Sequence, residues 1–467
     1  MAAKVTFALY FGNRGFFPER LIATARKEVK ERIESLGYGT IMMDASATPH
    51  GAVETSAEGR KYAAFLEENR GKYDGVVLCL PNFGDENGAV AALQNAGTPI
   101  LIHAYPDRLN EMDFTSRRDA ACGKFSVMDV FHQYGIDFTS FMPHVVSPSS
   151  QTFVEHIHDF ARVCRVVKGM KNLTVGAIGA RTTAFKTIRF DELTLQKYGI
   201  TTETLDMSQV IMRVRRMPDN YPKVQEKVKK LREYANWNDV PNESFGTLVK
   251  LGVVLDEITQ EFNLDTLAVR CWLELEQELK VAPCALVSET NDRLIPTACE
   301  VDVCNAVTMH GLRLASELPA TCLDWNNNYG EEENKFILFH CGPVPKTLMT
   351  CKGKVVDHPM FAKALGPGNG YGPIVGRIAP SPITYSSCKT EDGKLTYYLG
   401  QGRITEDEIP EGFFGCAGVV EIDRLQEKLL KIGYGGYRHH VSMTFGHVER
   451  AVREAFSRYL KYEVMEL

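Results

Sequence analysis

The chain has 467 residues and a formal net charge of −6 at pH 7. With 44% hydrophobic and 24% charged residues, its composition is that of a globular protein, and its length predicts two or three domains, of which we expect three. The acidic balance argues against a nucleic-acid partner, and the apolar runs are too short for a membrane span. The opening residues MAAKVTFALYFGN are typical of a first strand rather than a signal peptide, so we expect a cytoplasmic protein.

Residues 1–170 alternate strand and helix patterns, which predicts an N-terminal α/β domain with a parallel sheet. The predicted strands are VTFALYFGN, TIMMD, DGVVLCLP and PILIHAYP. The predicted helices are PERLIATARKEVKERIESLG, RKYAAFLEENRGKY, ENGAVAALQNAG and QTFVEHIHDFARVCRVVKGM.

Residues 171–318 predict a second α/β domain, also Rossmann-like. It begins with the strand LTVGAIGAR, continues with helices at FDELTLQKYG, KVQEKVKKLREYAN and residues 245–262, and ends with the helix after TACEVDV. Residues 319–467 predict a β-rich α+β domain, because Gly and Pro turns separate its strand patterns. Those patterns are ATCLDW, KFILFHCGPVP, PIVGRIA, KLTYYLGQG and GCAGVVEI, followed by a terminal helix at HVERAVREAFSRYLKY.

Two turns at predicted strand ends are candidate ligand sites, since ligands of open α/β sheets bind there. FGNRGFFP carries Asn13 and Arg14, although a surface turn with inward-packed aromatic rings is an equal interpretation. GAIGAR ends in Arg181, a candidate for contact with an oxygen-rich ligand. It lacks the third glycine of a dinucleotide fingerprint and an acidic residue at the next strand end, so a tight turn near a ligand cleft is favoured over a cofactor site.

The twelve cysteines include no CxxC motif. The closest pair, Cys299 and Cys304, is spaced for neither tetrahedral zinc nor a disulfide. Reduced and mostly buried thiols are therefore the better interpretation.

Glu300 and Asp302, in TACEVDVCNAVTM, stand where an apolar helix enters the interior. Capping and the helix dipole account for one acidic group there but hardly for two, because buried carboxylates are rare unless paired or bound to metal. Further on, LDWNN carries Asp324 after a strand. The segment YRHHVSMTFGHV carries Arg438, His439, His440 and His447.

Taken together, TACEVDVCNAVTM, LDWNN and RHHVSMTFGHV resemble, in order and spacing, the metal-binding segments of the L-fucose isomerase family, whose L-arabinose isomerase relatives share the architecture. The resemblance implies that Glu300, Asp324 and His440 bind a metal and that the two carboxylates also form the acid/base pair. It covers residues 297 to the end, and the first 300 residues only through the α/β layout and the two turns.

The same resemblance implies a homo-oligomer, a trimer or hexamer, with its active site at a subunit interface. Asn13 and Arg14 would then serve substrate recognition in a neighbouring subunit. Two carboxylates and one imidazole, without a thiolate, favour Mn²⁺ or Mg²⁺ over zinc or copper. We therefore expect a divalent-metal-dependent aldose–ketose isomerase that acts on a hexose or pentose through an enediol.

The default substrate is a neutral fucose- or arabinose-like sugar. Two departures from the family leave the sugar open: the chain is shorter than a typical L-fucose isomerase, and His439 stands where that family usually has Asn. Arg438 and His439, with Arg14 and Arg181, suit an anionic tail. Since sulfoquinovose isomerases occur in this superfamily, isomerisation of sulfoquinovose to sulfofructose is the alternative.

Four further residues have two interpretations each. Trp325 lines the sugar pocket or packs in the core, and His340 binds a sugar hydroxyl or is a satisfied core histidine. Asp302 is taken as a cap or a support for the ligands, and His447 as a support for the ligands or a structural residue rather than a ligand. Two other functional classes stay open: a non-catalytic sugar-binding protein, and a nicotinamide oxidoreductase that the incomplete glycine pattern disfavours.

Overall fold

The computed structural model describes residues 4–113, 115–410 and 412–467. The chain forms two compact units: unit 1 comprises Met1–Lys168 with Arg453–Lys461, and unit 2 comprises Gly169–Val452 with Tyr462–Leu467. In the described ranges no helix has the length and apolar character that crossing a membrane requires.

Unit 1 is built on a four-stranded parallel sheet with the strand order β2-β1-β3-β4. Its strands are nearly continuous apolar runs, as expected for a parallel sheet covered on both faces. The strands are β1 (Thr6–Phe11), β2 (Gly39–Met42), β3 (Gly75–Leu80) and β4 (Ile100–Ala104). The helices are α1 (Arg20–Ser35), α2 (Ser56–Glu68), α3 (Glu86–Leu93), α4 (Ala120–Gln133) and α5 (Gln151–Met170), and a π-helical turn over Ala455–Tyr459 also belongs to this unit. The helix before that turn, α15 (Glu449–Glu454), lies largely in unit 2.

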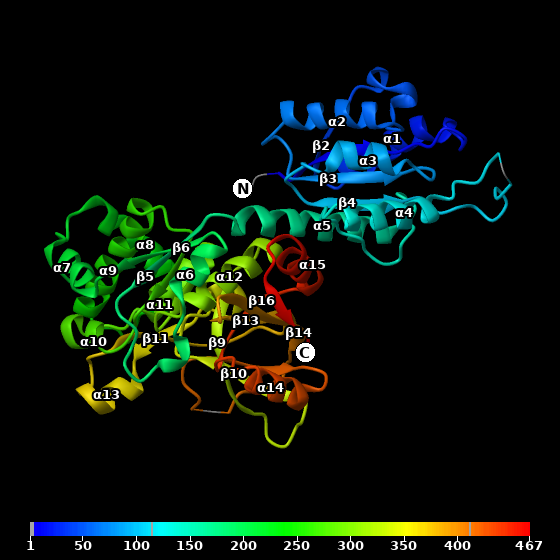
Figure 1. Ribbon diagram of the computed structural model, residues 1–467. Helices are drawn as coiled ribbons and strands as arrows, with labels where there is room; N and C mark the ends of the chain where they lie inside the picture. The colour runs from blue at the N-terminus through cyan, green and yellow to red at the C-terminus, as the bar shows by residue number, and fades with distance from the viewer. Residues whose placement is uncertain (1–3, 114, 411) are drawn as a thin grey trace. The chain divides into compact units, whose positions relative to one another are not determined.

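The two faces of this sheet bury alternate residues of β1. Tyr10 packs in a core with Tyr62 of α2 and Phe131 of α4, whereas Phe7 stacks on Phe160 of α5 with ring centroids 5.4 Å apart. Figure 1 shows α2 and α3 on one side of the sheet and α5 on the other. Unit 1 is therefore a three-layer α/β sandwich.

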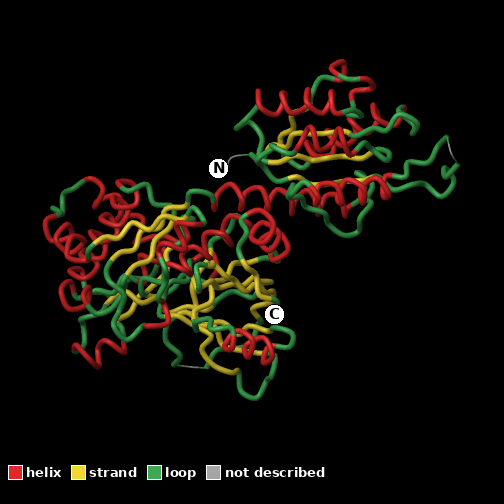
Figure 2. The backbone as a smooth tube through the Cα atoms, viewed as in Figure 1, coloured by secondary structure: helices red, strands yellow, loops and turns green. Residues whose placement is uncertain are grey.

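Unit 2 begins with a second four-stranded parallel sheet of order β6-β5-β7-β8. Figure 2 shows helices gathered around these strands. The strands are β5 (Leu173–Ile178), β6 (Ile200–Leu205), β7 (Thr266–Val269) and β8 (Thr297–Cys299). The helices are α6 (Glu192–Lys197), α7 (Met207–Arg216), α8 (Pro222–Tyr234), α9 (Asn242–Glu261), α10 (Glu274–Leu279), α11 (Cys284–Asp292) and α12 (Val303–Ser316).

The rest of unit 2 carries a nine-stranded mixed sheet of order β11-β12-β15-β10-β9-β16-β13-β14-β17. Because β14 also pairs with β15, six antiparallel strands from β15 to β14 close into a barrel, which leaves them no free edge. The strands are β9 (Ala320–Asn328), β10 (Lys335–His340), β11 (Lys354–Asp357), β12 (Tyr371–Arg377), β13 (Ser381–Glu391), β14 (Lys394–Ile404), β15 (Cys416–Glu421), β16 (His440–Phe445) and β17 (Glu463–Met465). Two helices accompany them, α13 (Pro359–Leu365) and α14 (Leu425–Tyr434).

The predicted fold class, two α/β sheets followed by a β-rich region, is confirmed. Parallel sheets lie in residues 6–104 and 173–299, and the mixed sheet lies in residues 320–465. Unit 2 holds a sheet from each side of the expected boundary at residue 318, and the division into domains 171–318 and 319–467 stays a prediction.

Candidate active site

Glu300 sits in a tight, left-handed connection between β8 and α12. Its φ is 60° and that of Val301 is 62°, a backbone region that costs residues other than glycine about 1–3 kcal/mol each. The connection ends at Asp302, whose carboxylate caps α12 by accepting the backbone N–H of Asn305 at 3.1 Å. The chain thus turns sharply, and the Glu300 side chain is buried with 9% exposure.

Strand register brings Asp324 and two histidines together. His440, the first residue of β16, lies directly opposite Asp324 of β9. Asp324 also lies opposite Phe339 of β10 on its other side, and His340 is the next residue of β10. Three neighbouring strands of the barrel therefore present polar side chains at one place.

The side chains of Glu300, Asp324 and His440 converge. His440 Nε2 lies 3.0 Å from Glu300 Oε2 and 3.5 Å from Asp324 Oδ1. His340 joins them, with its Nε2 3.6 Å from Glu300 Oε2. Two groups have their ligand atoms close enough to hold an ion: Glu300 with His340 and His440, and Asp324 with His439 and His440.

A buried chain of hydrogen bonds, from Arg438 through Asp302, fixes the orientation of His440. Its Nδ1 lies 2.8 Å from Asp302 Oδ2, and the other oxygen of Asp302 accepts a hydrogen bond from Arg438. A carboxylate can only accept, so Nδ1 carries the proton, and in the neutral imidazole Nε2 presents a lone pair to Glu300. This carboxylate–histidine arrangement is the one that orients metal-binding histidines.

A lone pair that faces a carboxylate oxygen at 3.0 Å requires positive charge between the two atoms. In the protein alone a proton supplies it. Burial lowers the pKa of His440, but Cys322, Asp302 and Glu300 outweigh burial and raise it well above its ordinary value. Burial likewise raises the pKa of Glu300, but His340 and His440 outweigh it and hold that pKa below its ordinary value. A divalent cation can replace this proton.

The buried polar atoms at the cluster fit such a cation. Glu300 Oε2 and Asp324 Oδ1 have no hydrogen-bond partner among the described residues. Unsatisfied buried oxygens are costly in a native structure unless an ion or water satisfies them. Two carboxylate oxygens and an imidazole nitrogen form a donor set suited to Mn²⁺ or Mg²⁺.

Trp272 and Phe185, which the sequence analysis did not select, complete the surroundings of Glu300. Trp272 Nε1 donates to Glu300 Oε1 at 3.1 Å, which leaves Oε2 to face the cluster. The Phe185 ring lies 4.9 Å from Trp272, 5.8 Å from His439 and 6.2 Å from His440, centroid to centroid. A lone aromatic residue in a loop carries no sequence signal that separates these roles from core packing.

The remaining candidates of unit 2 differ in how open they are. Arg438, expected to contact substrate, is 3% exposed and ion-paired with Asp302. His439 is 44% exposed, and its Nε2 lies 3.7 Å from Asp324 Oδ1. Trp325 donates from Nε1 to Tyr398 at 3.1 Å. Because Trp325 follows Asp324 on a strand, its side chain points to the opposite face.

Arg181 lies in the turn after β5, where its Nη1 donates to the carbonyls of Thr182 and Thr183 at 3.0 and 3.1 Å. His447 Nε2 lies 3.3 Å from the carbonyl of Gly402, which agrees with its expected structural role.

Asn13 and Arg14 belong to unit 1, at the end of β1. Asn13 is 2% exposed, donates to Glu54 at 3.0 Å and accepts from Asn82 at 2.7 Å. Arg14 pairs with Glu86, and its guanidinium carbon lies 4.2 Å from the centroid of the Phe83 ring. Both side chains are thus held by partners within unit 1.

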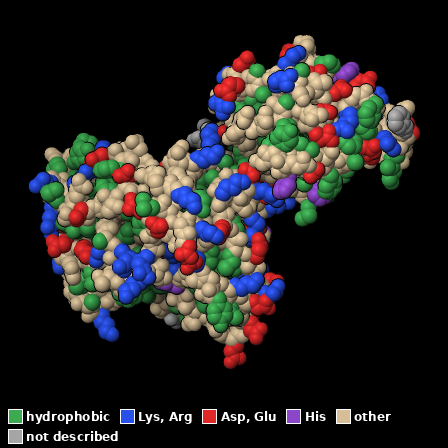
Figure 3. Space-filling model, in the orientation of Figure 1, with side chains coloured by type: hydrophobic (Ala, Val, Ile, Leu, Met, Phe, Trp, Pro, Cys, Tyr) green, Lys and Arg blue, Asp and Glu red, His purple; other side chains and the backbone are tan. Residues whose placement is uncertain are grey.

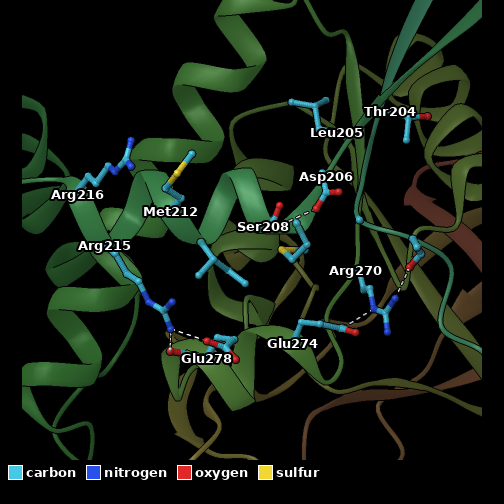
Figure 4. Close-up of a pocket in the computed structure, with 14 residues that line it drawn as sticks. Thr204, Leu205, Asp206, Ser208, Met212, Arg215, Arg216, Arg270, Glu274 and Glu278 are labelled. Atoms are coloured by element: carbon cyan, nitrogen blue, oxygen red, sulfur yellow. Dashed lines mark hydrogen bonds and ion pairs between the residues drawn. The ribbon is translucent and has the colours of Figure 1, made fainter.

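A cavity of about 830 Å³ lies at the carboxyl ends of β5, β6 and β7, where an open α/β sheet usually binds its ligand. Figure 4 shows two ion pairs on its wall, Arg215 with Glu278 and Arg270 with Glu274, together with Arg216 and Asp206, which are not joined to a charged side chain there. After β5 the chain forms only a 3-10 turn at Lys186–Ile188 before α6 begins at Glu192. The turn thus offers no α-helix N-terminus for a pyrophosphate, which disfavours the nicotinamide alternative further.

All twelve cysteines are free thiols. Nine of them are buried, Cys341 is half-buried, and Cys122 and Cys351 are exposed, as expected of mostly buried thiols.

Two family models match the chain. Residues 8–171 match the model described as fucose/sulfoquinovose isomerase, N-terminal domain, and residues 338–467 match L-fucose isomerase, C-terminal domain. The second match includes His340, His439 and His440.

Curated relatives are similar over most of their length. A sulfoquinovose isomerase of Priestia aryabhattai is 23% identical over 402 residues, 85% of this chain and 86% of the relative. One of Alkalicoccus urumqiensis is 22% identical over 412 residues, 86% and 88% of the two chains. One of Clostridium sp. (strain MSTE9) is 23% identical over 345 residues, 71% and 73% of the two chains.

Proposed function

The chain belongs to the fucose isomerase-like superfamily of aldose–ketose isomerases, which includes the sulfoquinovose isomerases, and on this premise we propose that it interconverts a sulfonated hexose and its ketose. The relatives' names favour this alternative over a fucose- or arabinose-like sugar. The observation that carries the proposal is the convergence of Glu300, Asp324 and His440, with unsatisfied oxygens on both carboxylates.

Glu300, Asp324 and His440 would hold Mn²⁺ or Mg²⁺. A divalent ion held there would supply Lewis acidity to the open-chain sugar. Asp302 and Arg438 keep His440 in the tautomer that this role needs. Trp272 keeps Glu300 Oε1 occupied, so that Oε2 is the oxygen available to the site.

The two carboxylates provide the proton transfer. One removes the proton from C2 of the aldose and returns a proton to C1, while the other passes the proton of the C2 hydroxyl to the C1 oxygen, so the enediol collapses to the ketose and no oxidant or reductant is required. Asp324 is 23% exposed and Glu300 9% exposed, so Asp324 is the carboxylate more open to a bound sugar.

His340 donates a hydrogen bond to a sugar oxygen. Its Nδ1 accepts the backbone N–H of Cys341 at 3.0 Å, so the proton of the neutral ring is on Nε2. That nitrogen faces the cluster and has no partner among the described residues. The arrangement supports a polar role for His340 over that of a satisfied core histidine.

Removal and return of the metal tests the proposal. A chelator first removes the metal from the protein, and Mn²⁺ is then added back. Ketose formation is followed by NMR with four substrates: a sulfonated hexose, its neutral parent sugar, fucose and arabinose. The same spectra measure exchange of the C2 proton with solvent. We expect turnover only with metal and fastest on the sulfonated hexose. Turnover that survives chelation would contradict the metal role, and preference for a neutral sugar would contradict the substrate.

Glu300→Gln removes the ligand charge with little change in size. We expect loss of Mn²⁺ affinity, measured by calorimetry, and a fall in turnover of about 10²-fold or more. Glu276→Gln is the matched control, because Glu276 is also buried on a neighbouring element but is not part of either candidate metal group. Full metal-dependent turnover in Glu300→Gln would remove that residue from the mechanism.

The assembly proposal rests on the family resemblance alone. A trimer or hexamer in which Asn13 and Arg14 serve a neighbouring subunit stays a prediction, as does a cytoplasmic location. Sedimentation velocity at several protein concentrations measures the assembly, and a monomer that retains full turnover would contradict it.

A further inference from the structure

If the substrate carries a sulfonate, some cation must bind it, and Arg438 is not available. Its guanidinium is 3% exposed and neutralised by Asp302. Arg14 belongs to unit 1 and is paired with Glu86 there. Among the basic residues that the sequence suggested for an anionic tail, Arg181 has no ion pair among the described residues. His439 Nε2 lies 3.7 Å from Asp324 Oδ1, a pair that is charged only when the imidazole is protonated.

The segment Arg181–Arg189, called the 181–189 segment below, is anchored beside the candidate metal ligands. Thr182 Oγ1 donates to the carbonyl of Trp272 at 3.3 Å. Arg270 Nη1 donates at 2.9 Å to the carbonyl of Ala180, the residue just before the segment. Trp272 is the residue whose indole donates to Glu300. The segment is therefore fixed to the same residue that orients a predicted ligand.

Phe185 is the residue of this segment that lies at the edge of the candidate metal cluster. Its ring contacts Trp272 edge-on and lies 5.8 Å from His439 and 6.2 Å from His440, between ring centroids. A sugar bound at Glu300, Asp324 and His440 would have Phe185 as an apolar wall. Lys186 follows Phe185 directly and Arg181 lies four residues before it, so both cations belong to the stretch of chain that borders the cluster.

The charge of the 181–189 segment is one-sided. It contains Arg181, Lys186 and Arg189 and no acidic residue. Arg181 and Arg189 donate to backbone carbonyls of the segment itself, and in the described ranges no carboxylate pairs with any of the three cations. In the view of Figure 3, Lys and Arg side chains gather over the part of unit 2 where Figure 1 draws this segment.

We propose, on the premise of the isomerase function above, that the 181–189 segment binds the acidic group of the substrate through Arg181 and Lys186. A sulfonate has three acceptor oxygens and one negative charge, which match guanidinium and ammonium donors. His439 lies between this segment and Asp324, in ring contact with Phe185. The segment thus determines specificity for an anionic hexose, while the metal ligands serve any aldose of suitable stereochemistry.

Arg181→Gln, Lys186→Gln and the double variant test this assignment. Turnover is measured on the sulfonated hexose and on its neutral parent, which has a hydroxyl in place of the sulfonate. We expect KM for the sulfonated sugar to rise about tenfold in each single variant and more in the double variant, with kcat nearly unchanged. Values for the neutral sugar should stay constant.

Lys197→Gln is the matched control. Lys197 is an exposed lysine of unit 2 that donates to the carbonyl of Gly393, so its loss changes the net charge equally. Added salt should weaken binding of the sulfonated sugar to the wild type more than to the double variant.

Two results overturn the assignment: equal effects on both sugars, which would mean a packing role only, or no effect on either. Failure of the proposed function is separate, because it is seen in the wild type, as no conversion of the sulfonated hexose.

Discussion

Asp302 holds two other residues of the candidate site at once. One oxygen orients His440 and the other neutralises Arg438, and the residue itself is completely buried. Burial raises the pKa of Asp302, but Arg438 and His440 outweigh burial and hold it below its ordinary value. The three residues form a support behind the predicted ligands rather than a surface for substrate.

Arg438→Gln should therefore harm the enzyme whatever the sugar. Removing one partner of a buried ion pair costs about 3–5 kcal/mol, and losing support behind a metal ligand lowers metal affinity about 10–100-fold. Thermal unfolding and Mn²⁺ titration measure the two effects. Arg403→Gln is the control, because its pair with Glu421 is on the surface and such pairs contribute about 1 kcal/mol or less. A loss confined to anionic sugars would instead support direct substrate contact by Arg438.

The stability of the fold should depend on pH through Glu276 of α10. It is completely buried, neither carboxyl oxygen has a partner among the described residues, and burial raises its pKa to about 8. Between the unfolded pKa and 8 the folded chain keeps a proton that the unfolded chain loses, so this group lowers stability as pH rises, by about 1.4 kcal/mol per pH unit.

Glu276→Gln imitates the protonated form and should remove that loss. Urea unfolding of wild type and variant is compared at several pH values between about 5 and 8. The stability difference should move in favour of the variant as pH rises. A difference that is constant with pH would mean that Glu276 titrates normally.

The residues that sequence could identify were those in a recognisable linear pattern. Glu300, Asp324 and His440 were selected because each stands in a short segment that resembles a family motif, and the structure brings all three together. The partner of Arg438 is 136 positions away, so no local pattern separates an arginine that binds substrate from one that holds Asp302. Trp272 and Phe185 depend in the same way on contacts between distant segments.

At the scale of elements, the register of β10, β9 and β16 decides the site. A shift by one residue would turn Asp324 and His440 to the opposite face. Gly415, just before β15, supports this register, because a Cβ on it would lie 2.6 Å from the carbonyl oxygen of His340. Its φ of 75° is also left-handed.

Gly415→Ala should displace the end of β10 and with it His340. We expect the free energy of unfolding to fall by more than the 1–2 kcal/mol or so that alanine costs at a left-handed φ, and we expect turnover to fall as well. Gly393→Ala, in the β13–β14 turn, is the control: its φ is 71°, but a Cβ there meets nothing within 4 Å. Equal effects of both substitutions on turnover, measured at saturating metal, would contradict a role for the Gly415 contact.

Element prediction succeeded for the long apolar runs, but it missed the short buried strand β7 and strands whose buried residues are polar. The strands from β1 to β4 were all predicted. β16 was not, although it is almost entirely buried, because Ser442 and Thr444 face α12 through hydrogen bonds to Asn305 and Ser316. Hydrophobic periodicity does not detect a face whose buried side chains are polar.

At the scale of the whole molecule, every residue of the candidate metal cluster belongs to unit 2. A ligand stabilises only the structure to which it binds, by an amount that grows with its concentration over its dissociation constant. The metal should therefore stabilise one unit and not the other.

Calorimetry of the metal-loaded and chelated protein tests this expectation. We expect Mn²⁺ to raise the unfolding temperature of unit 2, because a hundredfold excess over the dissociation constant adds about 2.7 kcal/mol to its free energy of unfolding. Hydrogen exchange should show protection in β8–α12 and β16 and none added in β1–β4. Equal protection of both units would mean that the metal acts through the assembly or at another site.

Val301 has a consequence for protein engineering. A β-branched residue at a φ of 62° is strained, and Val301→Gly would relieve about 1–2 kcal/mol of that strain. The side chain is also buried, with 5% exposure, so its removal would cost about 1.5–3 kcal/mol of apolar burial. Engineering for heat resistance therefore has nothing to gain at this peptide unit, because the strained residue is also a packed one.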